Sequence, residues 1–266
     1  MTQKSAGLAV ITGASGGIGA VYAERLAKRG YDLLLVARNR ERLEANAARI
    51  QATMGRKVDM LVADLANPAN VALLAERLAT DASISLLVNN AGVSLSGGLL
   101  DTEQRAVENL LALNVTAPTL LAAAAGKAFV ARHAGTIINI SSVLAFAPEL
   151  FDGVYSGSKS YLLNLTLSLA ETLKGTGVKV QAVLPGATRT EIWERSGKDV
   201  DALLPGKVMD AGDMVDAALL GLDRGEVVTI PPLADETLYE AANAARLALA
   251  PHLSARDVAP RYRSAA

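Results

Sequence analysis

The 266-residue sequence contains no cysteine, only two histidines and 4% aromatic residues. Without cysteine the chain has no disulfides, thiol nucleophiles or zinc–cysteine sites. His133 and His252 are too few to supply a Ser–His triad or a histidine metal site convincingly, so no metal site is expected. His133 stands in ARHAG, which is typical of a helix end, where the helix dipole favours a cation. We therefore expect a capping position for His133 and no catalytic role.

A charge excess and a long apolar run are also missing. Lys and Arg number 26 against 27 Asp and Glu, so no global field attracts nucleic acid or a membrane. The N-terminus lacks an apolar stretch that ends in a cleavage site, and we expect no signal peptide. The most apolar helical stretch, residues 115–131, includes Pro118, Gly126 and Lys127 and falls short of a clean membrane span. These features predict a cytoplasmic protein without nucleic-acid or membrane partners.

Short apolar runs alternate with amphipathic helical patterns along the chain. The runs cover residues 7–13, 31–37, 57–63, 85–90, 135–142, 178–185 and 226–232. They are continuously apolar, as in a sheet covered on both faces. The alternation predicts an α/β fold with a doubly wound parallel sheet of about seven strands and helices on both faces. No linker divides the chain, so we expect a single domain over 1–266, with a substrate lid at 190–207 and a C-terminal helical extension at 232–266.

A glycine-rich turn follows the first predicted strand. Gly13, Gly17 and Gly19 are spaced as G-x-x-x-G-x-G, which differs from the G-x-G-x-x-G dinucleotide fingerprint. Glycines nevertheless let the backbone turn tightly and approach a phosphate, and a helix N-terminus offers N–H donors. Ser15 adds a hydroxyl donor. The alternative is a plain tight turn, but the position between a first strand and a helix favours phosphate binding.

The second predicted strand ends in VARNRERL, where a nucleotide site often carries an acid for the adenosine ribose. Here Arg38 stands directly after the strand, and a guanidinium can grip a 2′-phosphate through two hydrogen bonds. Alternatively, Arg38, Arg40 and Arg42 form a solvated helix start. Cations at a helix N-terminus oppose the helix dipole, so a solvated helix start alone does not explain these arginines. We therefore favour NADP(H) over NAD(H).

Tyr155 and Lys159, in VYSGSKS, are four residues apart at the front of a helix expected over 158–174. Residues at this spacing share one face of a helix. A tyrosine hydroxyl has a pKa of roughly 10, and a nearby ammonium favours the phenolate. The pair is therefore a candidate acid–base catalyst with its tuning cation, although a surface tyrosine beside a solvated lysine has the same pattern.

Taken together, these motifs resemble the short-chain dehydrogenase/reductase family over roughly residues 7–230. The motifs, in the family's order, are TGASGGIG at 12–19, NNAG at 89–92, Asn114 in LNVTAP, INISS ending at Ser142, YSGSK at 155–159 and PGATRT at 185–190. The resemblance implies a Rossmann-type fold and an NADP(H)-dependent oxidoreductase that interconverts a carbonyl and an alcohol. It also implies a homodimer or homotetramer.

The resemblance assigns the catalytic roles to Asn114, Ser142, Tyr155 and Lys159. Ser142 would hold the substrate carbonyl, Tyr155 would donate the proton, Lys159 would lower the tyrosine pKa and hold the nicotinamide ribose, and Asn114 would hold a water. The implied cofactor contacts are Gly13, Ser15, Gly17, Ile18, Gly19, Arg38, Asp64, Leu65, Asn90, Ala91, Gly92, Tyr155, Lys159, Pro185, Gly186, Thr188 and Thr190. Asp64 also has the pattern of a cap for the following helix.

The predicted substrate loops, 143–153 and 191–207, are partly apolar. Their large apolar residues are Leu144, Phe146, Leu150, Phe151 and Trp193. They favour a hydrophobic small-molecule carbonyl substrate, with core packing under a lid as the alternative. A 3-oxoacyl-carrier-protein reductase would need basic surface near the pocket, for which Lys127 and Arg132 are thin support. A non-catalytic NADP(H)-binding sensor is a further alternative, but the complete catalytic set argues against it.

Overall fold

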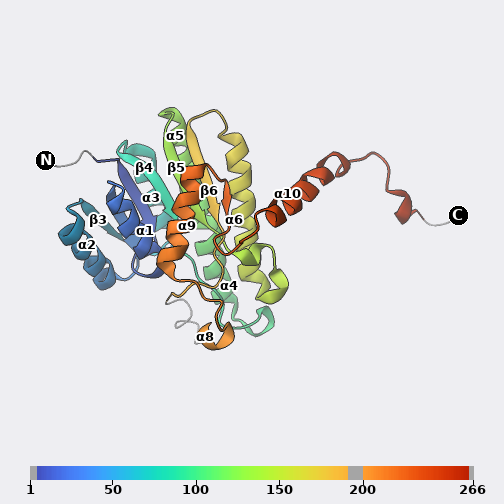
Figure 1. Cartoon of the computed structure of the whole chain (residues 1–266), viewed down its shortest axis with the longest axis horizontal. Helices are drawn as coiled ribbons and strands as arrows, with labels where there is room; N and C mark the ends of the chain where they lie inside the picture. The colour runs from blue at the N-terminus through green and yellow to red at the C-terminus, as the bar shows by residue number, and fades with distance from the viewer. Residues whose placement is uncertain (1–4, 191–199, 264–266) are drawn as a thin grey trace. The chain divides into compact units, whose positions relative to one another are not determined.

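The computed structural model of the chain describes residues 5–190 and 200–263. Its seven parallel strands are β1 (Leu8–Thr12), β2 (Asp32–Ala37), β3 (Val58–Val62), β4 (Ile84–Asn89), β5 (Gly135–Ile140), β6 (Val178–Val183) and β7 (Val228–Thr229). They form one sheet in the order β3-β2-β1-β4-β5-β6-β7 (Figure 1). The predicted seven-stranded, Rossmann-type sheet is confirmed. The strand order reverses between β1 and β4, and ligands of such folds bind at that switch point.

Helices cover both faces of this sheet. The longer helices of the body are α1 (Gly17–Lys28), α2 (Arg40–Met54), α3 (Pro68–Thr80), α4 (Gln104–Leu111), α5 (Ala117–Ala131), α6 (Gly153–Thr172) and α9 (Ala211–Arg224). The shorter helical elements are η1 (Leu99–Asp101), the π-helical turn η2 (Ala112–Thr116), η3 (Val143–Ala145), η4 (Pro148–Leu150) and α8 (Val200–Leu203). Side chains of α1, α2 and α9 pack on one face of the sheet, and those of α3 and α5 pack on the other.

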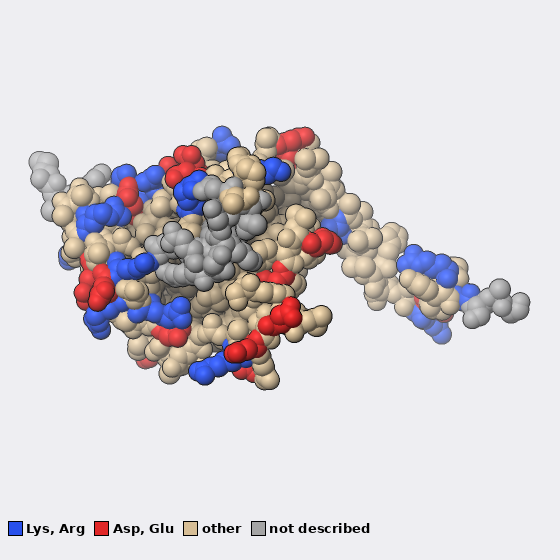
Figure 2. All heavy atoms as spheres, turned by 90° about the horizontal axis from the view of Figure 1, so that it is seen from below, with Lys and Arg blue, Asp and Glu red and all other residues tan. Residues whose placement is uncertain are grey.

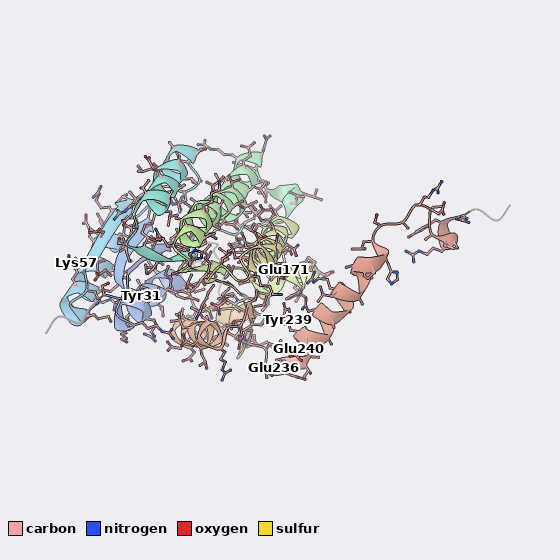
Figure 3. The ribbon with its side chains drawn as sticks, turned by 90° about the horizontal axis from the view of Figure 1, so that it is seen from above. Tyr31, Lys57, Glu171, Glu236, Tyr239 and Glu240 are labelled. Carbon is pink, nitrogen blue, oxygen red and sulfur yellow. The ribbon has the colours of Figure 1, made fainter. Side chains whose placement is uncertain are left out.

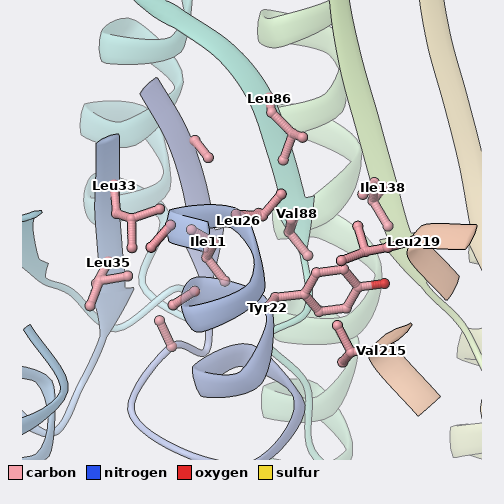
Figure 4. Close-up of a cluster of buried hydrophobic side chains, with 14 of the residues drawn as sticks. Ile11, Tyr22, Leu26, Leu33, Leu35, Leu86, Val88, Ile138, Val215 and Leu219 are labelled. Carbon is pink, nitrogen blue, oxygen red and sulfur yellow. The ribbon is translucent and has the colours of Figure 1, made fainter. Parts of the chain in front are cut away.

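Tyr22 of α1 is the largest fully buried side chain of the first layer. Its ring lies among Ile11, Val88, Ile138 and Leu219, which come from three strands and α9 (Figure 4). The hydroxyl has no hydrogen-bond partner among the described residues, and burial raises the pKa of Tyr22 above its usual range. The ring therefore contributes mainly apolar contact to this layer.

The opposite layer relies on small side chains. In α5, Ala122 and Ala125 are fully buried beside Leu121 and Phe129, so the helix lies close to the sheet. The continuous helical stretch Gln104–Ala131 is long and apolar enough to cross a membrane, but half of its most apolar window is buried inside the protein. A core helix of a covered sheet has the same composition.

The edge strand β3 departs from the predicted pattern of strands covered on both faces. Asp59, Met60 and Val62 are exposed, because β3 has only β2 as a neighbour. The charged residue Lys57 directly precedes this edge strand (Figure 3), and its N–H donates to the Asp32 carboxylate at 3.0 Å. Charged side chains of this kind protect a sheet edge from pairing with other chains.

Residues Leu233–Ala266 form a second unit of the chain, separate from Met1–Pro232. It contains α10 (Thr237–Leu249), η5 (Ala250–His252) and η6 (Pro260–Tyr262), so the sequence-predicted helix is present. No residue of α10, all of which is described, is buried. Glu236, Tyr239 and Glu240 lie at its beginning (Figure 3).

Candidate active site

A cleft of about 590 Å³ opens at the carboxyl ends of the central strands, beside the switch point. Most of the residues predicted from the sequence line it. These are Gly13, Ser15, Gly17, Ile18, Arg38, Asp64, Leu65, Asn90, Ala91, Gly92, Ser142, Tyr155, Lys159, Pro185, Gly186, Thr188 and Thr190. Of the predicted set, Gly19 and Asn114 do not line the cleft. Acidic and basic side chains are intermingled on the face shown in Figure 2.

The glycine-rich turn fits a pyrophosphate. Gly13 and Gly17 have φ of 69° and 51°, a left-handed conformation that side chains rarely adopt. Helix α1 begins at Gly17 with no side-chain cap and no acidic residue in its first turn. The N–H groups and positive dipole of that turn are therefore suited to hold an anion.

Gly19 lies behind this turn. A Cβ atom there would press on the Gly13 carbonyl oxygen and would lie 2.6 Å from Asn90 Nδ2. Asn90 is itself fixed, since its Nδ2 donates to the Thr12 carbonyl at 2.9 Å and its N–H to the Thr12 hydroxyl at 2.9 Å. Gly19 thus permits close packing between α1 and β1, whereas the sequence placed it among the cofactor contacts.

Two arginines line the end of the cleft beside β2. Arg38 is exposed directly after the strand, and Arg42 lies at the start of α2, where its N–H donates to the Asn39 side chain at 2.9 Å. Arg40 points to Glu44, at 3.6 Å, and does not line the cleft. Sequence reasoning missed Arg42, although the R-N-R-E-R spacing contained the signal. Two guanidinium groups at this end suit a phosphate on the adenosine ribose.

Asp64 lines the cleft and its Oδ1 accepts a hydrogen bond from the Ala66 N–H at 3.0 Å. The sequence also suggested that Asp64 caps the next helix, and this interpretation is wrong. Asn67 caps α3 by accepting from the Ala69 N–H at 2.9 Å. Asp64 lies too far before the helix to cap it, because α3 begins at Pro68 and Asn67 is the residue that directly precedes it.

Two neighbouring serines after β5 have different environments. The Ser141 hydroxyl donates to the Lys159 carbonyl at 2.7 Å and so joins the end of β5 to α6. Ser142 Oγ accepts from the Leu144 N–H at 3.2 Å, and its hydroxyl forms a hydrogen bond with the Tyr155 side chain in the cleft. This division of roles agrees with the choice of Ser142 as the catalytic serine.

Helix α6 begins at Gly153, five residues before the predicted start at Ser158. Asp152 caps it, because its Oδ1 accepts a hydrogen bond from the Tyr155 N–H at 2.7 Å. Tyr155 therefore lies in the first turn of α6 and Lys159 in the second. Sequence reasoning missed this cap, whose signal is an aspartate three residues before the tyrosine.

Lys159 is only 5% exposed, and its Nζ donates to the Ile140 carbonyl at 2.9 Å. Nζ lies 5.5 Å from the centre of the Tyr155 ring. Burial lowers the pKa of Lys159 to about 8. The arrangement brings the predicted pair together, with the ammonium held from the β5 side.

The pKa of Tyr155 is raised to about 12, mainly by burial, while a hydrogen bond with Ser142 lowers it and the Asp152 carboxylate raises it further. The sequence predicted the opposite direction, with Lys159 lowering the pKa. Burial prevails in the protein without cofactor, because transfer of the phenolate out of water is unfavourable. At neutral pH Tyr155 is consequently a protonated phenol.

Asn114 lies in the π-helical turn between α4 and α5 and is 1% exposed. Its Oδ1 accepts from the Val93 N–H at 2.9 Å, and its Nδ2 donates to the Val93 carbonyl at 2.8 Å and to the Ser158 hydroxyl at 3.2 Å. The side chain thus anchors the loop after β4 to α6. Its predicted water-holding role stays a prediction.

Residues 7–201 match the short chain dehydrogenase family. The chain belongs to this family. It is 48% identical to a short-chain dehydrogenase from Sphingobium yanoikuyae solved in complex with NADPH, with a TM-score of 0.93 over 96% of this chain and 100% of that one. It is 40% identical to the bulky-bulky ketone specific alcohol dehydrogenase from Comamonas testosteroni, with a TM-score of 0.90 over 97% and 99% of the two chains.

Two curated relatives are more distant. An uncharacterized oxidoreductase of Staphylococcus saprophyticus is 32% identical over 231 residues, which are 86% of this chain and 97% of that protein. Human 17-beta-hydroxysteroid dehydrogenase type 3 is 35% identical over 185 residues, 68% of this chain and 59% of that protein. This short-chain dehydrogenase is thus an oxidoreductase that uses a nicotinamide cofactor on alcohol or ketone groups.

The predicted catalytic residues of the dehydrogenase carry groups that could hold and protonate a carbonyl oxygen. When bound, the nicotinamide supplies or accepts the hydride. Ser142 and Tyr155 offer hydroxyl donors toward the oxygen on which negative charge develops during reduction. As predicted from the sequence, Tyr155 would also supply the proton that this oxygen must receive.

The loop after β5 divides between exposed and packed side chains. Phe146 and Leu150 are 52% and 75% exposed, whereas Leu144 is partly buried and Phe151 packs edge-on against the Tyr155 ring with centroids 5.6 Å apart. Half of the predicted lid at 190–207, residues 191–199 with Trp193, lies outside the described residues, and the second half begins with α8.

Proposed function

We propose that this short-chain dehydrogenase is an NADP(H)-dependent enzyme that interconverts a ketone and an alcohol on a bulky, hydrophobic small molecule. The observation that carries the proposal is a single cleft with Arg38 and Arg42 at one end and Ser142, Tyr155 and Lys159 on its wall. The NADPH bound by the Sphingobium yanoikuyae relative supports the cofactor.

Exposed apolar side chains support the substrate class. Phe146 and Leu150 follow β5, and Leu99 and Leu100, 56% and 97% exposed, follow β4. Loops after neighbouring parallel strands leave the sheet at the same edge, which is the edge that holds the cleft. The name of the Comamonas testosteroni relative indicates a ketone with bulky groups on both sides, and that of the human relative adds steroids to the candidates.

The structure gives little support to the alternative of a 3-oxoacyl-carrier-protein reductase. Arg132, one of the two basic residues considered for binding the carrier, donates to the Ile84 carbonyl at 2.7 Å and lies over the Phe129 ring, so its guanidinium is already engaged within the protein. The sensor alternative keeps one argument, because the human inactive hydroxysteroid dehydrogenase-like protein 1 is 31% identical over 179 residues. The complete catalytic set of this chain favours an enzyme.

We also propose a cytoplasmic homodimer or homotetramer. Leu111, Leu120 and Tyr161, on α4, α5 and α6, are 43%, 49% and 40% exposed, and Thr119 bonds to the Tyr161 hydroxyl at 3.1 Å. Apolar side chains on adjacent helices suit a self-complementary contact. Light scattering on the purified protein should give a dimer or tetramer mass, and a monomer at all concentrations would contradict this.

The test is oxidation of NADPH by the purified protein with small ketones, ketones bulky on both sides, steroids and 3-oxoacyl thioesters. We expect turnover of the bulky ketones, and a loss of nearly all turnover in Tyr155→Phe with NADPH binding retained. Tyr262→Phe, the same change at a 69% exposed position that does not line the cleft, is the matched control and should stay active. Full activity in Tyr155→Phe, or an equal rate with NADH, would contradict the proposal.

A further inference from the structure

The ring of Phe151, in the loop between β5 and α6, contacts the ring of Tyr155. The ring centroids are 5.6 Å apart, and the ring planes are inclined by 68°. Aromatic rings favour this edge-to-face arrangement, and such a contact adds to the gain from burial alone. Phe151 is half-buried and does not line the cleft. It therefore supports a residue of the cleft wall without forming part of that wall.

The position of Phe151 relative to α6 explains why the two rings meet. Asp152 is the N-cap, so Phe151 is the residue before the cap and Tyr155 is the third helical residue. At many helix starts an apolar residue before the cap packs against the fourth helical residue and fixes the direction in which the chain enters the helix. Here the fourth residue is Ser156, whose buried hydroxyl donates to the Asp152 carbonyl at 2.9 Å. The apolar contact falls on Tyr155 instead.

Tyr155 has one apolar neighbour among the positions on its side of the helix. Residues three and four positions apart share a helix side, which gives Phe151 and Asp152 before the tyrosine and Ser158 and Lys159 after it. The Ser158 hydroxyl donates to the Tyr155 carbonyl at 2.7 Å, and Lys159 Nζ donates to a carbonyl at the end of β5 at 2.9 Å. Of these four positions, Phe151 alone offers an apolar surface to the phenol ring.

We propose that Phe151 is a positioning residue that holds the Tyr155 ring in the orientation in which its hydroxyl lies in the cleft beside Ser142. The inference rests on the proposed function, in which Tyr155 donates the proton. An acid must come within about 3 Å of the atom that it protonates, and a misplacement of about 1 Å can cost up to about 100-fold in rate. An edge-to-face pair shifts the balance between two ring orientations by roughly two- to tenfold.

Phe151→Leu should slow the chemical step and leave binding unchanged. Leucine keeps an apolar residue before the cap but lacks the ring that contacts Tyr155. The rate of NADPH oxidation in a single turnover should fall roughly two- to tenfold, by the same factor for small ketones and for ketones bulky on both sides. KM for each ketone and Kd for NADPH should stay within about twofold of wild type, because Phe151 does not line the cleft.

The experiment measures the single-turnover rate, KM, NADPH affinity and Tm of wild type, Phe151→Leu, Phe151→Tyr and Phe129→Leu. Phe151→Tyr retains an aromatic ring and should keep the wild-type rate. Phe129→Leu, the same change at a fully buried ring that does not line the cleft, is the matched control and should lower Tm without slowing the reaction. An unchanged rate in Phe151→Leu, an equal loss in Phe151→Tyr, or a KM change for bulky ketones alone would overturn the proposal.

A crystal structure of cofactor-free Phe151→Leu tests the same role without turnover. The Tyr155 ring should occupy a second orientation or move relative to Lys159 Nζ, which lies 5.5 Å from the ring centre here. A single ring orientation at the wild-type position would overturn the proposal. A wild type inactive on every carbonyl compound would contradict the proposed function, while the crystal structure would still decide the role of Phe151.

Discussion

Two glycines near the beginnings of two helices should respond in opposite ways to the same substitution. Gly19 in α1 and Gly157 in α6 are both helical and neither has a positive φ. Alanine is the better helix former by up to about 1 kcal/mol, so propensity alone would stabilise both variants. The difference lies in the space that a Cβ atom would occupy.

At Gly19 the added methyl group would overlap fixed atoms. It would press on the Gly13 carbonyl oxygen, lie 2.8 Å from the Gly13 carbonyl carbon and lie 2.6 Å from Asn90 Nδ2. The Asn90 side chain is held by Thr12, so neither neighbour moves freely. Overpacking of this kind costs about 1–3 kcal/mol, and contacts with backbone place Gly19→Ala at the upper end, near 2 kcal/mol after the gain in propensity. At Gly157 nothing lies within 4 Å of the added atom, so the gain of up to about 1 kcal/mol remains.

Thermal unfolding followed by circular dichroism, at one protein concentration, tests the pair. For a chain of this size about 1 kcal/mol corresponds to roughly 2–4 °C in Tm, so Gly19→Ala should melt roughly 4–8 °C lower and Gly157→Ala up to roughly 4 °C higher. Gly19→Ala should also bind NADPH more weakly, since the phosphate turn must shift. Equal Tm changes in the two variants would refute the packing argument.

Two further predictions concern charged residues. Arg38→Asp should weaken NADPH binding at least about tenfold and improve NADH binding, as measured by fluorescence titration. Arg40→Asp, which changes an arginine that does not line the cleft, should alter neither affinity. An equal loss of NADPH affinity in both variants would contradict the 2′-phosphate role of Arg38. Burial lowers the pKa of Lys159 from 10.5 to about 8, so between these values the unfolded chain holds a proton that the folded chain has lost, and wild-type stability should rise with pH across this window. The rise in the free energy of unfolding should be about 3 kcal/mol for wild type when urea unfolding at pH 8 and pH 10.5 is compared, and Lys159→Met should lack it. Parallel plots of unfolding free energy against pH for the two proteins would contradict this prediction.

The strands and most helices were predictable because burial on both sides leaves a continuous apolar signature. The exceptions have local causes. Strand β3 lies at the sheet edge and exposes Met60 and Val62. The sequence of a strand does not indicate whether the strand is central or at the edge, so this exposure was not predicted. The start of α6 was placed too late because Gly153 and Gly157 lower the apparent helix propensity, while the cap supplied by Asp152 begins the helix before them.

Most of the residues predicted for the site line the cleft, but the charge states in it were not predictable. The spacing of Tyr155 and Lys159 correctly brings the two side chains together, at 5.5 Å from Nζ to the ring centre. It carries no information on burial, which raises the pKa of the phenol and lowers that of the ammonium. Similarly, the glycine spacing does not separate Gly17, which lines the cleft, from Gly19, which packs behind it.

The two consecutive serines Ser141 and Ser142 have different tasks, since the first fixes the end of β5 to α6 and the second lines the cleft. Ser141 donates to the Lys159 carbonyl at 2.7 Å, and Lys159 Nζ donates back to the Ile140 carbonyl at 2.9 Å. These two bonds clamp the end of β5 to the second turn of α6, and both are buried, where competition from water is weak. Ser142 directly follows Ser141 at the β5 end of this clamp, and Tyr155 lies one helical turn before Lys159 at its α6 end. The distance between the two substrate-facing hydroxyls is therefore governed by a serine and a lysine that need not touch the substrate, and a change at Ser141 should disturb catalysis through geometry alone.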